Sequence, residues 1–365
     1  MSKILLVGDT HLGLGYPNKL EHFFKVSTEY FETFLFPIME KHLSKKDIIV
    51  FLGDLFDNRN IVPINILNYA QYILERMSKI CQVHLLIGNH DIYNKSDNEI
   101  NSLKAYNYIP DVYVYETTTK IEFNGKKILM MPWIEEKKEQ IEILKKYSGA
   151  DYLFCHSDLN GAKMHLTSVA HRNQDKIDVE EFNGYKNVYS AHIHLVQKNK
   201  NFTFVGSIHE MDRNDIDNQK GIFVLDTNKD TELFIPNNIS PKFKKIYINK
   251  EEDIELLTEN VTKNWIDLFI SNNLLVNNRK LRRKMETVLR EGSFATVEYI
   301  DDISTDEDNK EEIAENESLS INLDYSEYIK NYILTQTYEE KAKNGILSEF
   351  SNIIEIYKES KKKLD

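Results

Sequence analysis

The sequence lacks the features that mark secreted, membrane-spanning and ATP-hydrolysing proteins. Its only two cysteines, Cys81 and Cys155, fit neither a disulfide framework nor a cysteine metal site, which indicates a reducing compartment. No run approaches the roughly 18 apolar residues of a membrane span, and the apolar run before Gly8 is shorter than a signal-peptide core. A Gly-x-x-x-x-Gly-Lys-[Ser/Thr] loop is absent too, which excludes ATP hydrolysis by that route. We expect a soluble, cytoplasmic protein without membrane contact.

The charge of the chain is acidic but unevenly distributed. There are 46 basic and 58 acidic residues among 365, a formal net charge of −12, which by itself argues against a nucleic-acid partner. Much of that charge lies in residues 301–317, with nine acidic residues and one lysine, whereas residues 242–245 and 279–284 are basic clusters. The net charge therefore does not decide which partner the protein binds.

Short apolar strands alternate with helical periods through residues 1–240, the pattern of an α/β domain. The predicted strands cover residues 3–7, 48–52, 83–87, 127–131, 151–155, 187–191, 202–206 and 221–225. Asn124 and Gly125 stand between two apolar runs and predict a hairpin over residues 121–131. The apolar residues of 63–80 fall on one helical face, and Pro63 suits its first turn.

The pattern changes after residue 240. Residues 241–300 predict a small second module with the order strand, helix, strand, helix, strand. Residues 301–324 have the composition of an acidic, flexible linker. Residues 325–365 show two helical periods broken near 343–345, which predict a helical hairpin. Two helices of this length cannot form a core alone, so they dock on a partner, which we favour, or pack back on the main body.

Side chains that can bind metal ions follow five of the predicted strands. They are Asp9 and His11, then Asp54 and Asp57, then Asn89 and His90, then His156, and finally His192 and His194. One such residue is more often a cap or a surface group, but five successive strand ends of this kind are hard to obtain by chance. Ligands bind at the carboxyl ends of strands in open α/β sheets, so we expect these groups to converge. The other histidines are expected to be surface or core residues: His22, His42, His84, His165, His171 and His209.

The predicted ligand types indicate a pair of metal ions. The seven proposed ligands are Asp9, His11, Asp54, Asn89, His156, His192 and His194. Mixed nitrogen and oxygen ligands suit Mn, Fe or Zn better than Mg or Ca. Seven ligands exceed the need of one ion but suit two ions that share a carboxylate and activate water for phosphoryl transfer. His90 is the predicted general acid, with Asp57 orienting its imidazole and keeping it charged.

In this order, Asp-x-His, Gly-Asp-x-x-Asp, Gly-Asn-His-Asp, a lone His and His-x-His resemble the motifs of the calcineurin-like metallophosphoesterases, over about residues 8–194. The resemblance implies a four-layer αββα sandwich. It implies a first metal held by Asp9, His11, Asp54 and His194, and a second held by Asp54, Asn89, His156 and His192. It also implies that His90 and Asp57 form the acid dyad.

The runs "GDTHLG", "GDLFD", "GNHD", "MPW", "HSDLNG" and "FIPNN" are similar to those of SbcD-type DNA-repair nucleases, in particular the phage recombination endonuclease subunit. This implies a Mn-dependent DNA nuclease, in the host cytoplasm if phage-encoded. It implies that residues 241–300 form a capping domain on DNA, and that residues 325–365 dock on an SbcC-type coiled-coil ATPase. It also implies a homodimer through helices at 63–80 and 99–109, for which core packing is the alternative. The Ser-Ala before His-x-His and the missing proline after Gly206-Ser207 depart from the pattern.

The same residues are compatible with two other functions. A phosphatase or small-molecule phosphodiesterase would use the same metal site, although Asp57 is not followed by the Arg-Gly of the protein phosphatases. A non-catalytic scaffold for the ATPase would show a degenerate site, whereas all predicted catalytic positions are filled. The basic cluster 279–284 is a solvated helix face, which we favour, or a contact for DNA phosphates.

Overall fold

The structure is a computed structural model that describes residues 2–94, 97–168, 173, 175–271, 274, 278–291, 294–300 and 350. It divides into two compact units, residues 1–302 and residues 303–365. The predicted acidic linker and the predicted C-terminal hairpin lie outside the described residues, except for Phe350. All the other described residues lie in the first unit.

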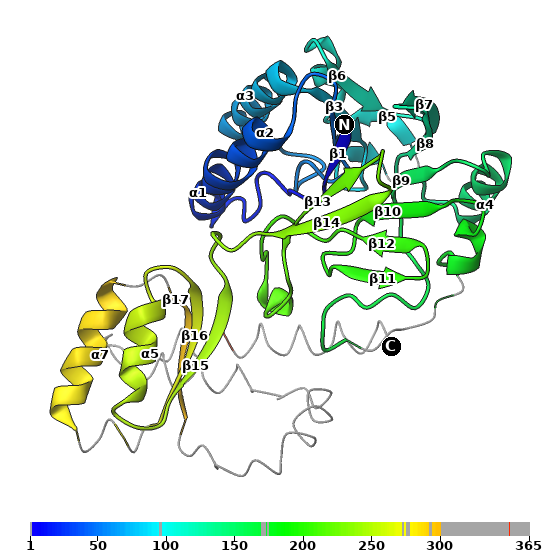
Figure 1. The fold of residues 1–365 in the computed structure, drawn as a ribbon. Helices are drawn as coiled ribbons and strands as arrows, with labels where there is room; N and C mark the ends of the chain where they lie inside the picture. The colour runs from blue at the N-terminus through cyan, green and yellow to red at the C-terminus, as the bar shows by residue number, and fades with distance from the viewer. Residues whose placement is uncertain are drawn as a thin grey trace. The chain divides into compact units, whose positions relative to one another are not determined.

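Two six-stranded sheets form the larger part of this unit (Figure 1). In spatial order the first sheet contains β14 (Thr231–Pro236), β13 (Gly221–Asp226), β1 (Lys3–Val7), β2 (Ile48–Phe51), β3 (Gln82–Leu86) and β6 (Val112–Tyr115). The second contains β11 (Gln197–Asn199), β12 (Phe202–Phe204), β10 (Asn187–Ala191), β9 (Tyr152–His156), β8 (Lys126–Met131) and β7 (Thr119–Phe123). Strands β1, β2, β3 and β6 run parallel, as do β8, β9, β10 and β12, so each sheet gathers several carboxyl ends at one edge.

Helices cover the outer faces of both sheets. The first sheet is covered by α1 (Leu20–Glu29), a π-helical turn at Tyr30–Leu35, α2 (Phe36–His42) and α3 (Ile64–Ile80), and the second by α4 (Lys137–Lys146) and a 3₁₀ turn at Val179–Phe182. Alternate strand residues point to opposite faces. In β1, Leu5 packs toward the helices, whereas Ile4 and Leu6 pack toward the second sheet. Three apolar layers therefore separate four layers of secondary structure, and the predicted αββα sandwich is confirmed.

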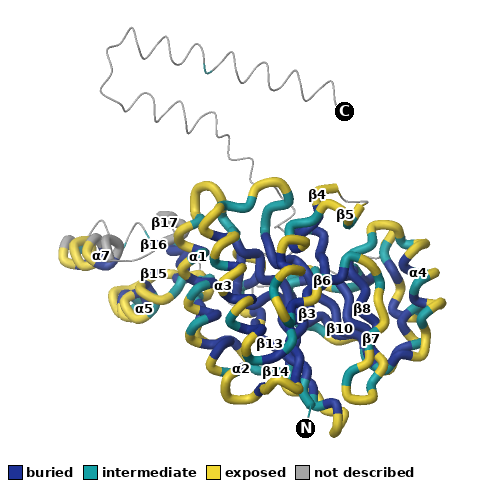
Figure 2. Tube along the Cα trace, turned by 90° about the horizontal axis from the view of Figure 1, so that it is seen from above, coloured by how far each residue is buried: buried dark blue, intermediate teal, exposed yellow. Residues whose placement is uncertain are grey.

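Local sequence signals account for several of these elements. The predicted hairpin is present, since β7 and β8 pair antiparallel around Asn124 and Gly125, which both have positive φ. Helix α3 follows Pro63 and buries Ile66, Ala70, Ile73, Leu74 and Met77, the predicted apolar face. The buried residues lie on the strands and the inner helix faces, as Figure 2 shows.

The prediction of a helix over residues 99–109 is wrong. This segment contains the end of strand β5 (Asp97–Asn101), which pairs with β4 (Ile92–Asn94), and a short 3₁₀ turn at Lys104–Tyr108. The Asn101 side chain donates to the Asn98 carbonyl three residues earlier, and such a local bond competes with a helix. The Asn98 side chain donates to the distant carbonyls of Glu116 and Trp133. Only Leu103 and Tyr106 of the segment are buried.

A separate three-stranded parallel sheet follows β14. It contains β15 (Phe243–Ile248), β16 (Trp265–Ser271) and β17 (Phe294–Ile300), connected by α5 (Asp253–Asn260) and α7 (Arg279–Glu291). We call residues 243–300 the β15–β17 module. The order of its elements is as predicted, and its assignment as a capping domain stays a prediction. In α7, Leu281 and Met285 are buried while Arg282, Arg283 and Lys284 are exposed, so this basic cluster lies on a solvated helix face.

Candidate metal centre

The predicted ligands follow the carboxyl ends of five strands from both sheets. Asp9 and His11 follow β1, Asp54 follows β2, and Asn89 follows β3; His156 ends β9, and His192 and His194 follow β10. The structure brings them together. Three groups have ligating atoms within 4.8 Å of one another: Asp9, His11 and His194; Asp54, His156 and His192; and His11, Asp57 and His90. The expected convergence of distant residues is therefore present.

Asn89 and Asp54 hold the middle of the arrangement. The side-chain oxygen of Asn89 lies 2.9 Å from Nε2 of His156 and 2.8 Å from Nδ1 of His192. The Oδ2 atom of Asp54 lies 3.4 Å from Nε2 of His156 and 3.7 Å from Nε2 of His11. Asp54 thus lies between the two histidine groups, the place that a shared ligand must occupy.

The imidazole rings of His11 and His194 turn their Nε2 atoms toward each other. Nε2 of His194 and Nε2 of His11 are 3.2 Å apart. The Nδ1 atom of His156 lies 2.8 Å from the carbonyl oxygen of Leu52. A carbonyl only accepts, so this nitrogen carries the proton and Nε2 is left as the ligating atom. These orientations fit side chains that bind metal ions rather than one another.

The backbone at the centre is constrained. Three predicted ligands have positive φ although none is glycine: 43° at His11, 52° at Asp54 and 85° at His192. Such conformations are sparsely populated and cluster at functional sites. Gly53 and Gly88 are needed here, because a Cβ atom would lie 2.3 Å from Nδ1 of His156 at the first and 2.2 Å from Oδ1 of Asp54 at the second. The glycines of both motifs therefore make room for ligands.

The ionisation of the centre divides the histidines into two pairs. Burial opposes the charged form of His11 and His156, but pairing with Asp57, Asp54 and Asp9 outweighs it and raises both pKa values to about 9. Burial would also raise the pKa of Asp54, yet the neighbouring His156 and His11 hold it well below its usual range. By contrast, burial and a charged neighbouring ring lower the pKa of His192 to about 4 and that of His194 to about 3.

The predicted contact between the carboxylate of Asp57 and His90 is not the one observed. Oδ1 of Asp57 lies 3.2 Å from Nδ1 of His11, and His90 Nδ1 instead contacts the backbone carbonyl oxygen of Asp57. The reason is the pairing of two loops. A parallel bridge joins Leu12 to Phe56, and the amide of Asp57 donates to the Leu12 carbonyl at 3.1 Å, which turns the Asp57 side chain toward the His11 loop.

The structure adds a buried carboxyl group that was not among the predicted site residues. Asp91 is 1% exposed and accepts from the amides of Gly88 at 2.9 Å, Phe56 at 3.1 Å and Leu55 at 3.3 Å. It therefore joins the loops that carry Asp54 and Asn89. The signal in the sequence was its place beside His90 in the Gly-Asn-His-Asp run, but two of its partners, Leu55 and Phe56, lie more than 30 residues away.

Trp133 and Asp158 also lie beside the centre. The indole ring of Trp133 is 5.0 Å from the ring of His192 and contacts His156 edge to face at 5.8 Å. The carboxylate of Asp158 lies 3.8 Å from Nε2 of His192 and pairs with Lys176 at 2.8 Å. Both belong to runs noted in the sequence, "MPW" and "HSDLNG", where residue type alone did not separate them from structural residues.

Within the described residues, no helix is both long and apolar enough to cross a membrane. This finding accords with the absence of long apolar runs from the sequence.

Comparison with known proteins identifies the family. The Metallophos family, described as calcineurin-like phosphoesterases, matches residues 2–196. Exonuclease subunit 1 of Enterobacteria phage T4 is 28% identical over 244 residues, covering 65% of this chain and 68% of that protein. Putative phosphoesterase 244L of Invertebrate iridescent virus 6 is 26% identical over 217 residues, covering 56% of this chain and 70% of that protein. The solved structure of an archaeal phosphodiesterase has a TM-score of 0.32 and 12% identity, covering 64% of this chain and 99% of that one.

The family match includes every predicted metal ligand, since all seven lie between Asp9 and His194. The fold that the residues form, two sheets between helices with ligands at the strand ends, agrees with that match. The chain therefore belongs to the calcineurin-like phosphoesterase family and is a metal-dependent phosphodiesterase.

Proposed function

We propose that this chain is a Mn-dependent DNA nuclease, the nuclease subunit of an SbcCD-type complex for double-strand-break repair and recombination. The observation that carries the proposal is the convergence of carboxylate, amide and imidazole groups from five strand ends. The similarity to a phage exonuclease subunit supports DNA as the substrate. Both exonuclease and endonuclease action fall within this proposal.

The donor atoms fit two divalent ions. One ion would be held by Asp9, His11 and His194, the other by Asn89, His156 and His192, and Asp54 would be shared. Ions bound there supply an acidified water and neutralise charge on the phosphate. The mixture of imidazole nitrogen with carboxylate and amide oxygen favours Mn, Fe or Zn over Mg or Ca, and among these we propose Mn.

His90 is the proposed general acid. The Asp57 carbonyl oxygen near its Nδ1 atom only accepts, so Nδ1 carries a proton and Nε2 exchanges the other with the leaving oxygen. The His90 amide donates to Oδ1 of Asp54 at 2.7 Å, which fixes the residue beside the shared ligand. Asp57 would orient His90 through its backbone and His11 through its carboxylate.

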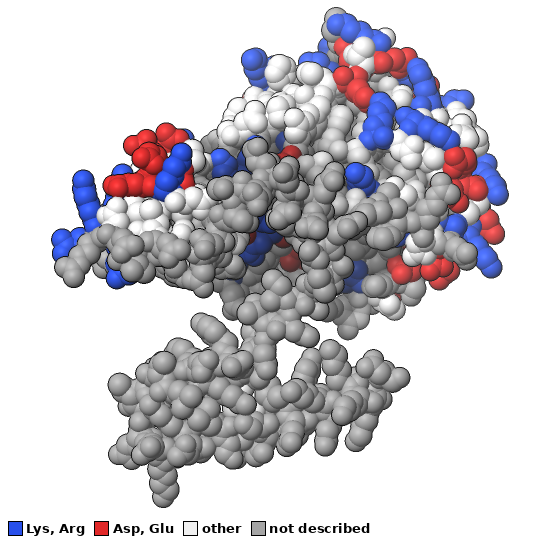
Figure 3. Space-filling model, turned by 90° about the horizontal axis from the view of Figure 1, so that it is seen from below, with Lys and Arg blue, Asp and Glu red and all other residues white. Residues whose placement is uncertain are grey.

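The proposed partners are DNA, an SbcC-type coiled-coil ATPase and a second copy of this chain. For the homodimer, α3 and the turn near it expose apolar side chains: Ile64 is 76% exposed, Ile61 51% and Tyr108 90%. Large apolar side chains exposed to solvent suit an interaction site. The basic and acidic side chains on the face in Figure 3 are interspersed where the structure describes them, so charge singles out no DNA path there.

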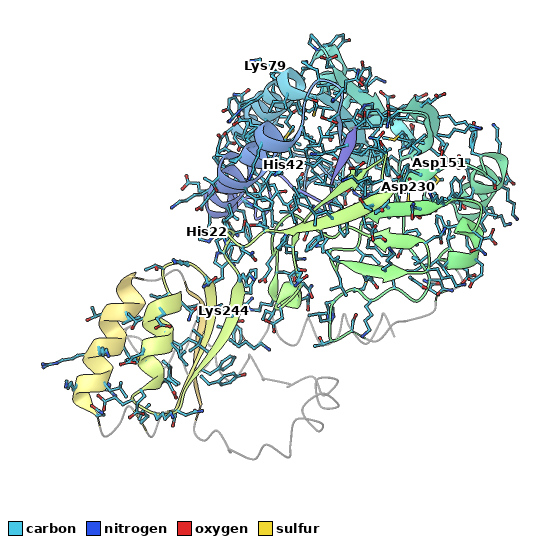
Figure 4. All side chains as sticks on the ribbon, in the orientation of Figure 1. His22, His42, Lys79, Asp151, Asp230 and Lys244 are labelled. Carbon is cyan, nitrogen blue, oxygen red and sulfur yellow. The ribbon has the colours of Figure 1, made fainter. Side chains whose placement is uncertain are left out.

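The test uses the purified full chain with labelled single- and double-stranded DNA, in Mn, in Mg and with chelator. We expect cleavage in Mn, none with chelator, and a loss of about 10²–10⁴-fold for His90→Ala, the usual contribution of a general acid. His42→Ala is a matched control, because His42 lies on α2 outside the centre (Figure 4). Cleavage of a nitrophenyl diester but not of DNA, even with the ATPase subunit present, would identify a small-molecule phosphodiesterase instead.

A further inference from the structure

The segment from Ser207 to Lys220 supports the backbone of two proposed metal ligands. The Ile208 amide donates to the Asp9 carbonyl at 3.1 Å. The ammonium of Lys220 donates to the His194 carbonyl at 2.8 Å, and the Ser207 amide donates to the same oxygen at 3.3 Å. The segment therefore hydrogen-bonds the backbone of Asp9 and His194 without contributing a ligand itself.

The same segment makes polar contacts to the β15–β17 module. The Phe243 amide, at the start of β15, donates to Oε2 of Glu210 at 2.6 Å. The guanidinium of Arg213 donates through Nε to Oδ2 of Asp267 at 2.6 Å and through Nη2 to Oδ1 at 2.9 Å. Asp267 lies on β16 and is buried, and this bidentate geometry is the most directional of ion pairs.

The interior of the segment is braced by a buried ion pair. Lys220 is 3% exposed in its side chain and Asp215 5%, and their charged atoms are 2.6 Å apart. Lys220 also donates to Oγ of Ser207 at 2.9 Å, and Asp215 accepts from the Met211 amide at 2.9 Å. Removing one partner of a buried pair leaves an uncompensated charge and is strongly destabilising, so this pair fixes Lys220 within the segment.

Aromatic side chains complete the contact between α1 and the β15–β17 module, which we call the joint. Trp265 of β16 packs against Phe23 of α1, with ring centroids 5.1 Å apart, and against Phe243 at 4.5 Å. The Trp265 indole N–H donates to Nε2 of His22. Figure 4 shows His22 on α1 and Lys244 on β15 at this joint. The module is thus seated on the sandwich by packing and by the polar contacts of the segment together.

We propose that residues 207–220 form a strut that sets the positions of Asp9 and His194 according to how the β15–β17 module is seated. Lys220 is the positioning residue at the metal centre, and Glu210 and Arg213 are the contacts through which the module acts. A partner or substrate that shifts the module would then alter metal binding and turnover at a distance. This inference rests on the proposed phosphodiesterase function of the centre.

The test removes both polar contacts to the module in the full chain, as Glu210→Ala with Arg213→Ala. It measures Mn²⁺ affinity by calorimetry and turnover of bis(p-nitrophenyl) phosphate, a small diester. We expect Mn²⁺ affinity and ester turnover each to fall about tenfold, the lower end of the effect of outer-shell changes at metal sites. Lys186→Ala is the matched control, because it removes an exposed ion pair to Asp230, 2.8 Å long, outside the joint. It should leave both quantities unchanged.

The outcomes separate this inference from the proposed function. If the double variant matches the unaltered chain within twofold in both Mn²⁺ affinity and ester turnover, the strut is refuted while the function stands. If only DNA cleavage falls, the module contacts DNA without acting on the centre, and the strut is again refuted. If the unaltered chain hydrolyses neither ester nor DNA, the proposed function fails, and Mn²⁺ affinity alone still decides for or against the strut. Thermal unfolding of each variant confirms that the fold is intact at the assay temperature.

Discussion

Replacing Asp91 with alanine should destabilise the protein far more than an ordinary change of charge. Its carboxylate accepts from the amides of Gly88, Phe56 and Leu55, and Asp91 is 1% exposed. Each buried amide that loses its acceptor costs about 1–3 kcal/mol. With three such amides, and water able to enter part of the vacated space, we expect the free energy of unfolding to fall by about 3–5 kcal/mol. That is a large share of the roughly 5–15 kcal/mol by which domains are stable.

Asp91→Asn should have a free energy of unfolding between those of the unaltered chain and Asp91→Ala. One amide oxygen can keep the bonds to Gly88 and Leu55 in the place of Oδ2, but the NH₂ group then faces the Phe56 amide, donor against donor. We expect a loss of about 1–3 kcal/mol, one unsatisfied amide. The control is Asp97→Ala, which removes an exposed acceptor of the single Glu99 amide bond, 2.7 Å long.

The assay is urea unfolding of the full chain followed by circular dichroism, with the urea dependence compared between variants. The control should change the free energy of unfolding by less than about 0.5 kcal/mol, as surface changes usually do. The reasoning is refuted if Asp91→Ala unfolds within about 1 kcal/mol of the unaltered chain, because a single lost bond costs that much. Metal affinity should fall in parallel, because the loops carrying Asp54 and Asn89 lose their common anchor.

Three further predictions concern the centre and the core. Gly88→Ala places a Cβ 2.2 Å from Oδ1 of Asp54, so this carboxylate must move; diester turnover should fall about 100-fold with little change in circular dichroism. His11 and His156 have pKa values of about 9 and must lose protons to bind metal. Metal affinity measured by calorimetry should therefore rise with pH and level off above about pH 9. A flat profile from about pH 6 to 9 would contradict this. Burial lowers the pKa of His84 to about 4. A histidine in the unfolded chain has a pKa of about 6.5, so between about pH 4 and pH 6.5 the unfolded chain binds more protons than the folded one. The free energy of unfolding should therefore rise with pH across this window by up to about 3 kcal/mol. His84→Gln should remove this rise when unfolding is followed in urea at each pH.

The metal ligands were predictable because each follows an apolar strand whose length and boundaries are local properties. Asp9, Asp54 and Asn89 come after strands recognisable from their own residues, and parallel strands bring their carboxyl ends to one edge. The hairpin at Asn124 and the helix after Pro63 were predictable for the same reason, since turn and cap preferences act over a few residues.

Contacts between distant loops were not predictable in this way. That the Asp57 carboxylate faces His11 depends on the bridge between Leu12 and Phe56, which joins two loops far apart in the chain. The start of the segment 99–109 is a strand because it pairs with the neighbouring strand β4 in a short hairpin. Neither pairing has a periodic signal in the chain.

The sequence by itself determined the strands, the order of the ligands and thus the chemistry of the centre, because these follow from residue type and local spacing. The tertiary structure decided which carboxylates support the ligands, as Asp91 does, and which segment joins the centre to the β15–β17 module, as Lys220 and Arg213 do. The physical reason is that these roles depend on bonds to partners tens of residues away, such as Phe56 for Asp91, His194 for Lys220 and Asp267 for Arg213. Only the packed fold brings them within bonding distance.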